Sequence, residues 1–427
     1  MSEWKEYRLG DLIESVSKTF KFGDTKVYFL NTSDTLEGKV INHELFKPED
    51  LPGQAKKSIK LNDILYSEIR PANKRYAFVD FNPDNYVVST KLMVLRIVET
   101  TIVIPKYLYY YLTSNETIDL LQFLAESRSG TFPQIRFEEV SHLSISLPTI
   151  PIQEQIVELI SSLDDKIELN NKINQELENL AQTLFKQWFI DFEFPNENGE
   201  PYKSSGGEMV DSELGEIPKG WEVYRFKEIV SKYIDNRGKT PPIANDGIPL
   251  VEVRQMVDTG IYPSLRTDKF LSKEVYDTFL RGHLLKDDIL MSTVGTIGRL
   301  NIVPDFQIFA IAQNVLGIRF NKDLTSQFFM FCLMRTKDFN DEINSRLIET
   351  VQSSIKRSDL EKIPVILPKL ILVERFDSLI RDIFDRIKNS ALEIEELTNL
   401  RDILLSKLIS GELHVTSKKT NTNYKLS

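Results

Sequence analysis

The chain has few of the residues that build a metal centre, a disulfide or a membrane anchor. Its 427 residues include one cysteine, Cys332, and four histidines, His43, His142, His283 and His414. A single cysteine excludes any disulfide within the chain and fits a reducing cytoplasm, and residues this scattered form no zinc cluster. No apolar run approaches the roughly 20 residues that cross a membrane, and the opening Met-Ser-Glu-Trp-Lys-Glu lacks the pattern of a signal peptide. We therefore expect a cytoplasmic protein with no metal centre.

Catalytic motifs are also missing. The sequence has no Asp/Asn-Pro-Pro-Tyr/Phe segment, which an adenine methyltransferase would use to hold its target amino group. Near Asp63 it reads Glu-Ile-Arg at 68–70, not the Glu-x-Lys of a metal-dependent nuclease, and Glu-Trp-Lys at 3–5 has no Asp before it. Ser-Thr-Val-Gly-Thr-Ile-Gly-Arg at 292–299 lacks the Gly-Lys-Ser/Thr ending of a phosphate loop. This pattern favours a reader or scaffold over an enzyme.

The formal net charge of −10 argues at first sight against a nucleic-acid binder. However, residues 151–215 hold 14 Asp or Glu against 4 Lys or Arg, which accounts for the whole deficit. Residues 1–150 carry a net charge of −2, and residues 216–368 and 369–427 carry +1 each. Basic surfaces can therefore exist outside the acidic stretch, and that stretch suits a protein partner better than phosphates.

The chain presents one pattern twice. Trp-Lys-Glu-Tyr-Arg at 4–8 matches Trp-Glu-Val-Tyr-Arg at 221–225, and the Leu-Pro at 147–148 matches the Leu-Pro at 367–368. We call residues 1–150 head 1 and residues 221–368 head 2. Two copies of one module suit a ligand with two halves, and duplex DNA is the commonest ligand of that kind.

Short β-rich runs separated by Pro, Gly, Asn and Asp predict strands in the same order in both heads. The predicted elements of head 1 are strands 27–30, 64–66, 76–79 and 92–97 and helices 107–112 and 117–126. Those of head 2 are strands 248–253, 288–291, 300–303 and 315–320 and a helix over 326–335. Each head is therefore predicted to be a mixed α/β domain.

A heptad pattern follows each head. Its steps alternate between four and three residues, which keeps one stripe of each helix facing a partner helix. At roughly 1.5 Å per residue each helix would be about 60 Å long. Neither stripe is wide enough to stabilise a lone helix, so we expect the two helices to pack on each other. The predicted seam is Ile156, Ile160, Leu163, Ile167, Asn170, Asn174, Leu177, Ala181, Leu184 and Trp188 in the first helix, and Phe376, Ile380, Ile383, Ile387, Ser390, Ile394, Leu397, Arg401, Leu404 and Leu408 in the second.

Polar residues interrupt both seams, with Asn170 and Asn174 in the first helix and Ser390 and Arg401 in the second. One interpretation is that the heptads drift off the interface there. The other is register control, because a buried polar residue costs stability but penalises misaligned pairings.

These patterns divide the chain into six parts. They are head 1 (1–150), a first helix (151–194), a linker rich in Gly, Pro, Ser, Asn and acids (195–220), head 2 (221–368), a second helix (369–413) and a flexible tail (414–427). The predicted fold class is α/β (α+β), with two mixed α/β heads in a pseudo-two-fold tandem repeat joined by two long antiparallel coiled-coil helices.

Two pairs of loops at corresponding places in the heads carry basic and amide side chains. The first pair is 67–75 and 292–299, and the second is 127–136 and 346–357. Arg and Lys can bind phosphates, Arg can contact guanine and Gln can contact adenine, whereas the alternative for each loop is an ordinary exposed turn. The candidate DNA-binding residues are Arg70, Lys74, Arg75, Lys91, Arg128, Gln134, Arg136, Arg299, Arg346, Gln352, Lys356 and Arg357.

Five segments carry a resemblance to a known family: Trp-Lys-Glu-Tyr-Arg-Leu-Gly-Asp-Leu-Ile at 4–13, Leu-Pro-Thr-Ile-Pro-Ile-Gln-Glu-Gln-Ile at 147–156, Leu-Phe-Lys-Gln-Trp-Phe-Ile-Asp-Phe at 184–192, Ser-Glu-Leu-Gly-Glu-Ile-Pro-Lys-Gly-Trp-Glu at 212–222, and Asp-Ile-Leu-Met-Ser-Thr-Val-Gly-Thr-Ile-Gly-Arg at 288–299. In this order the chain resembles, over nearly its whole length, the specificity (S) subunit of type I restriction–modification systems. The second copy departs at 368–375, where only Glu374 keeps the Glu-Gln pattern.

The resemblance implies that each head is a target-recognition domain that reads one half of a bipartite double-stranded DNA site, and that the helices act as a ruler between the half-sites. It implies two modification (methyltransferase) subunits docked around the helices, with restriction (endonuclease and translocase) subunits completing the assembly. Adenine-N6 methylation and cleavage, together with S-adenosylmethionine, ATP and Mg, would belong to those partners. The chain itself is then expected to be a non-catalytic recognition subunit without a cofactor.

Two other functions remain open from the residues alone. One is a coiled-coil protein-interaction scaffold that does not bind DNA. The other, less favoured, is an autonomous nuclease.

Overall fold

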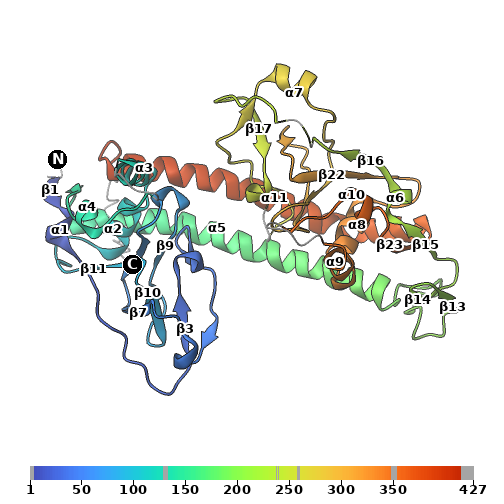
Figure 1. Cartoon of the computed structure of the whole chain (residues 1–427), viewed down its shortest axis with the longest axis horizontal. Helices are drawn as coiled ribbons and strands as arrows, with labels where there is room; N and C mark the ends of the chain where they lie inside the picture. Colours follow the sequence, from blue (N-terminus) through green and yellow to red (C-terminus); the bar gives the residue numbers. More distant parts are fainter. Residues whose placement is uncertain are drawn as a thin grey trace, which may run out of the picture. The chain divides into compact units, whose positions relative to one another are not determined.

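The computed structural model describes residues 4–127, 133–236, 238, 240–256, 260–347 and 353–414 (Figure 1). The chain forms two compact units. Unit 1 comprises Met1–Ile167 with Glu396–Ser427, and unit 2 comprises Glu168–Glu395. Each unit therefore holds one head together with a part of each long helix, and each is described by itself.

Head 1 is built from short strands that form two four-stranded sheets, with small helices beside them. The predicted strands 27–30, 64–66, 76–79 and 92–97 and both predicted helices are confirmed, with ends shifted by at most two residues. Its elements are β1 (Lys5–Arg8), α1 (Leu9–Leu12), β2 (Ile13–Ser15), β3 (Val27–Leu30), η1 (Thr32–Asp34), β4 (Thr35–Leu36), β5 (Lys39–Val40), β6 (Leu45–Phe46), η2 (Pro48–Asp50), β7 (Ala55–Ser58), β8 (Ile64–Ser67), η3 (Pro71–Asn73), β9 (Tyr76–Phe78), β10 (Tyr86–Ser89), β11 (Leu92–Ile97), α2 (Pro105–Leu112), α3 (Asn115–Glu126), α4 (Phe137–Ser141) and β12 (Ser144–Leu147).

Head 2 repeats this order of elements. The four strands and the helix predicted for it are confirmed, again with ends shifted by at most two residues. Its elements are β15 (Glu222–Arg225), α6 (Phe226–Ile229), β16 (Val230–Ile234), β17 (Ile248–Val251), η5 (Val253–Gln255), β18 (Phe270–Leu271), α7 (Lys273–Phe279), β19 (Ile289–Ser292), β20 (Leu300–Ile302), β21 (Ala310–Ile311), β22 (Val315–Phe320), α8 (Gln327–Met334), α9 (Lys337–Asn344), α10 (Arg357–Leu360) and β23 (Pro364–Leu367).

The strand topology confirms the duplication. The antiparallel sheet β2-β11-β8-β9 of head 1 corresponds to β16-β22-β19-β20 of head 2, and the parallel pair β3–β10 corresponds to β17–β21. The two sequence landmarks that begin and end each copy are strand partners: Lys5 lies opposite Leu147, and Glu222 lies opposite Leu367. The central strands β11 and β22 are apolar almost throughout because both of their faces are buried.

The connection between the copies departs from the prediction of an irregular linker. Met209–Ser212 (β13) and Gly215–Pro218 (β14) pair as an antiparallel hairpin. Gly215, with φ +97°, permits its tight turn, and the side chain of Ile217 is 3% exposed in the core of unit 2. Strands of four residues among acids, Ser and Gly give too weak a periodic signal to predict.

The first long helix, α5 (Ile150–Phe185), ends earlier than the predicted residue 194 and continues as a π-helical turn, η4 (Lys186–Ile190). In this turn Phe189 packs edge-on against Phe329 and Phe376, with ring centroids 4.8 and 4.9 Å apart. A π-turn has one more residue in each hydrogen-bonded ring than an α-helix. Phe189 therefore enters the core of unit 2 at a position that a regular heptad repeat does not predict.

The second long helix is α11 (Leu370–Ile409), and it is antiparallel to α5 within each unit (Figure 1). In unit 2, Phe185 packs against Phe376 while Asn170 bonds to Glu393. In unit 1, Ile156 and Ile160 share a core cluster with Leu405 and Leu408.

The buried stripe of α5 drifts away from the predicted heptads after Asn174. The predicted Ala181 is buried there, as are Glu178, Phe185 and Phe189, which the prediction omits. The predicted Leu177, Leu184 and Trp188 pack beside them and remain partly exposed. On α11, Phe384 and Leu405 are buried although the predicted seam omits them. The drift follows from spacing, because an α-helix turns every 3.6 residues and a heptad repeats every 3.5.

Two of the four polar seam residues, Asn170 and Arg401, have partners across the helix pair, whereas Asn174 Oδ1 and Ser390 Oγ are buried without a hydrogen-bond partner among the described residues. Asn170, 3% exposed, donates through Nδ2 to Glu393 Oε2 at 2.9 Å. In unit 1, Arg401 Nη1 donates to Asp164 Oδ1 at 3.0 Å, and Tyr110 of head 1 donates to the other oxygen of Asp164 at 2.8 Å. These bonds support register control, because sliding one helix along the other would leave buried polar groups unpaired.

Candidate nucleic-acid interface

The structure brings the two predicted loops of head 1 side by side. The backbone amide of Arg70 donates to Pro133 O at 3.1 Å, and the amide of Ile135 donates to Glu68 O at 2.8 Å. A third segment joins them, because the amide of Glu68 donates to Lys91 O, in the turn between β10 and β11, at 3.2 Å. These three segments form the candidate surface of head 1.

Head 2 forms the same arrangement from the equivalent residues. The amide of Gly295 donates to Ser353 O at 3.2 Å, and the amide of Ile355 donates to Thr293 O at 3.1 Å. The amide of Thr293 donates to Asn314 O, in the turn between β21 and β22, at 2.9 Å. Sequence reasoning identified the loop pairs in each copy, and the structure places them in contact within each head.

On the surface of head 1, Arg70, Lys91, Gln134 and Arg136 are exposed. Arg70 and Lys74 both have positive φ (45° and 53°) and flank the 3-10 turn η3, whose single proline, Pro71, and short turn fix their backbones. Lys74 is half-buried, and its Nζ lies 3.9 Å from Glu37 Oε1. The exposed residues are therefore free to turn their side chains toward a ligand on a backbone that is held in place.

Arg75 and Arg299, two of the predicted DNA-binding residues, make hydrogen bonds within their own heads. Arg75 Nη1 donates to Ser33 O at 3.0 Å and Thr35 O at 3.1 Å, and Arg299 Nη1 donates to Met256 O at 3.3 Å and to Val253 O at 3.5 Å. Both side chains are half-buried. Each arginine thus braces a 3-10 turn, η1 or η5, against the recognition loop of its own head.

The remaining DNA-binding candidates of head 2 differ in the interactions that their side chains make within the head. Arg346 pairs with Glu342, and its Nη1 donates to the Glu342 carbonyl at 2.8 Å. Arg357 pairs with Glu361 at 3.1 Å and lies 5.3 Å from the centroid of the Tyr233 ring. Lys356 is exposed and directly precedes α10, and Arg136 is likewise exposed and directly precedes α4.

Two predicted candidates, Arg128 and Gln352, lie outside the described residues, as does the predicted tail from residue 415.

Sequence reasoning missed a buried ion pair that each head contains at the same place. Asp63 accepts two bonds from Arg96 (2.8 and 2.7 Å), and Asp288 accepts two from Arg319 (2.8 and 2.7 Å). Both aspartates are 1% exposed. An alignment of the two copies contained the signal, since each Asp precedes a strand that leads into a recognition loop.

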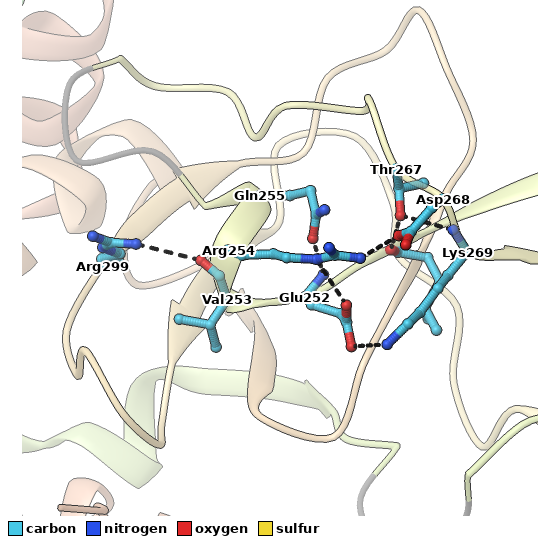
Figure 2. Close-up of polar contacts among 9 residues, drawn as sticks. Glu252, Val253, Arg254, Gln255, Thr267, Asp268, Lys269 and Arg299 are labelled. Atoms are coloured by element: carbon cyan, nitrogen blue, oxygen red, sulfur yellow. Dashed lines mark hydrogen bonds and ion pairs between the residues drawn. The ribbon is translucent and has the colours of Figure 1, made fainter. Parts of the chain in front are cut away.

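A second group that sequence reasoning missed surrounds η5 in head 2. Figure 2 shows Glu252, Arg254, Asp268 and Lys269 linked by ion pairs, with Arg299 reaching the backbone of the same turn from the other side.

A hydrogen bond to the carboxyl group of Asp377 links head 2 to α11. Ser326 Oγ donates to Asp377 Oδ1 at 2.7 Å. Burial raises the pKa of Asp377 to about 6, while its hydrogen bond with Ser326 and the charge of Arg381 lower it and the charge of Glu374 raises it.

Because the folded pKa of Asp377 lies above its ordinary value, the contribution of this carboxyl to the stability of unit 2 is fully present below about pH 4 and is lost as the pH rises through about 6. We expect D377N to remove this loss and to stabilise unit 2 at pH 7 by about 2 kcal/mol, since an asparagine oxygen still accepts from Ser326. Urea unfolding between pH 4.5 and 8 measures it, with D382N at an exposed position of α11 as the control. A D377N chain as pH-dependent as the parent would contradict the assignment.

Within the described residues, no helix is long and apolar enough to cross a membrane. The same residues contain no group of three or more His, Cys, Asp or Glu side chains placed to hold a metal ion.

The duplicated head and its antiparallel helix pair define a class of two-headed recognition proteins, and comparison with known proteins identifies the family. The family model described as the type I restriction modification DNA specificity domain matches residues 1–179 and 218–403. The type I restriction enzyme HindI specificity subunit of Haemophilus influenzae is 34% identical over 97% of this chain and 100% of the relative. The chain therefore belongs to the family of type I restriction–modification specificity subunits.

Other similarities are more distant. The type I restriction enzyme MjaIX specificity subunit of Methanocaldococcus jannaschii is 30% identical over 73% of this chain and 70% of the relative. Among solved structures, the S subunit of a type I restriction-modification system from M. genitalium is 14% identical, with a TM-score of 0.47 over 97% of both chains.

Proposed function

We propose that this chain is the DNA-recognition subunit of a type I restriction–modification complex and that each head reads one half of a bipartite duplex target. The observation that supports this most strongly is the repeated surface, in which the same three segments are joined by the same backbone hydrogen bonds in both heads. Exposed Arg and Lys side chains on such a surface supply affinity through phosphates, and Gln134 and its neighbours supply base contacts.

The helix pair supports a spacing role. α5 and α11 are continuous helices of 36 and 40 residues, and each contributes residues to both units. The Asn170–Glu393 pair in unit 2 and the half-buried Asp164–Arg401 pair in unit 1 link the two helices and support a fixed register. We propose that the helix pair acts as a ruler whose length determines the gap between the half-sites.

Partner subunits supply the chemistry in this proposal. α5 exposes the apolar side chains Leu169 (52%), Ile173 (44%) and Leu180 (47%), which a docked protein would cover. We propose that two modification subunits bind the helices and that restriction subunits complete the assembly. S-adenosylmethionine, ATP and Mg would bind to those partners, and we expect this chain alone to cleave no DNA when magnesium is added.

DNA titration of the chain in complex with its modification subunit tests the proposal. We expect salt-dependent binding, and we expect the triple variant R70A/K91A/R136A to bind more weakly. Each lost phosphate contact should reduce the slope of log K against log salt by about 0.9, so three lost contacts reduce it by about 2.7.

A triple variant K47A/K219A/K273A is the matched control, because these lysines are 60%, 62% and 75% exposed, pair with carboxylates and lie outside the candidate surfaces. Binding that ignores salt would favour the scaffold function. Equal losses in the two triple variants would show that the three segments are not the contact surface.

A further inference from the structure

The 3-10 turn η5 is fixed beside the recognition loop of head 2. Arg299, the last residue of the 292–299 loop, donates to carbonyls at both ends of the turn. Met256, the residue after the turn, anchors η5 because its side chain is 1% exposed and packs in a core cluster. Gln255 Oε1 accepts from the amide of Glu252 at 3.0 Å and closes the turn on itself. The backbone that carries Arg254 is therefore held relative to the candidate DNA surface.

The side chain of Arg254 is 53% exposed and oriented by carboxylates. Its Nε donates to Glu252 Oε2 at 3.1 Å, and its Nη2 pairs with Asp268 (Figure 2). Lys269 Nζ lies 2.8 Å from the other oxygen of Glu252. The group thus contains two cations and two carboxylates, and Asp268 is its most exposed member at 71%.

This mixture of charges suits a base edge better than a phosphate. The two carboxylates offset the charges of Arg254 and Lys269, so the group as a whole attracts a phosphate only weakly. A G·C pair in the major groove is neutral and presents the acceptors N7 and O6 of guanine next to the amino donor of cytosine. An arginine beside an aspartate presents donors next to an acceptor, which is the complementary pattern.

The geometry of the guanidinium permits this contact. Each terminal nitrogen carries two N–H groups, so Nη1 and the second N–H of Nη2 can make a bidentate contact with guanine while the bonds to Glu252 and Asp268 stay in place. Arginine bidentate to guanine is the commonest specific base contact in protein–DNA complexes.

We infer that Arg254 is a specificity-determining residue of head 2 that contacts a guanine, with Asp268 placed for the amino group of the paired cytosine. This inference deepens the proposed function and rests on it. In head 1 the middle residue of the corresponding turn, η1, is Ser33. The contact therefore belongs to one half-site only.

Methylome sequencing of a host that expresses the chain with its modification subunit tests the inference. For R254A we expect one G·C position in one half-site to lose discrimination by about 10- to 100-fold, while the other half-site and the gap stay unchanged. R254K keeps the charge but loses the bidentate fork, so we expect a weaker preference at the same position. K273A, which removes an exposed paired cation from the same head, should leave the motif intact.

An unchanged motif in R254A would overturn the inference, and so would uniformly weaker methylation at every position, which marks a phosphate contact. If R254A fails to assemble, the motif of R254K decides between the same outcomes. Absence of any bipartite motif with the parent chain would instead overturn the proposed function.

Discussion

Insertion of four residues into each long helix is expected to lengthen the gap of the DNA target by about two base pairs and to leave both half-sites unchanged. Four residues extend a helix by about 6 Å, and successive base pairs lie roughly 3.4 Å apart. The insertions belong between Asp164 and Asn170 in α5 and between Glu393 and Arg401 in α11. At these places the Asp164–Arg401 pair stays within unit 1 and the Asn170–Glu393 pair within unit 2.

Methylome sequencing measures the new gap. The same four residues inserted after Glu197, in the exposed turn between α5 and the β13–β14 hairpin, provide the control, and we expect them to leave the motif unchanged because they lengthen neither helix. A variant with longer helices that keeps the old gap but changes a half-site would refute the ruler.

The sequence was sufficient to predict the duplication and the strands of each head. Strands such as β11 and β22 are continuous apolar runs bounded by turn residues, and the same order occurs twice, so each copy supports the prediction for the other. The β13–β14 hairpin was not predictable in this way. It occurs once, its strands are four residues long, and it folds because Ile217 enters a core built from distant parts of the chain.

The positions of the recognition loops could be predicted, but the roles of individual side chains could not. Arg70 and Arg75 lie in the same loop and have the same chemistry, yet Arg70 is exposed and Arg75 donates to carbonyls 42 and 40 residues away in the sequence. Burial and partners arise from tertiary packing, which residue type and spacing do not encode. For the same reason Glu178, buried in a pair with Arg335 at 2.9 Å, was not recognised beside the more obvious Leu177.

The duplicated buried ion pair leads to the second large expectation, which concerns stability. Asp288 accepts from the amide of Leu285 at 2.8 Å as well as from Arg319, and Asp63 accepts from the amide of Lys60 at 2.7 Å as well as from Arg96. Each aspartate therefore holds both a strand and the tight turn before it, where Asn62 and Asp287 have φ 69° and 68°.

We expect D288A to destabilise head 2 by about 3–5 kcal/mol, because it leaves the largely buried Arg319 and a backbone amide without their acceptor. This is a large part of the roughly 5–15 kcal/mol that stabilises a domain. D63A should do the same to head 1, so urea unfolding followed by head-specific probes should show each variant lowering the transition of its own unit. D277A, which breaks the exposed Lys273–Asp277 pair, is the control and should cost less than about 1 kcal/mol.

The consequence for recognition follows from chain order. Asp288 immediately precedes β19, and β19 leads into the 292–299 loop. A D288A complex that still assembles through its helices should therefore lose discrimination in the half-site of head 2 while that of head 1 is retained, and D63A should show the reverse. Loss of both half-sites in either variant, or a cost of D288A no larger than that of D277A, would show that the two heads do not each depend on their own buried pair.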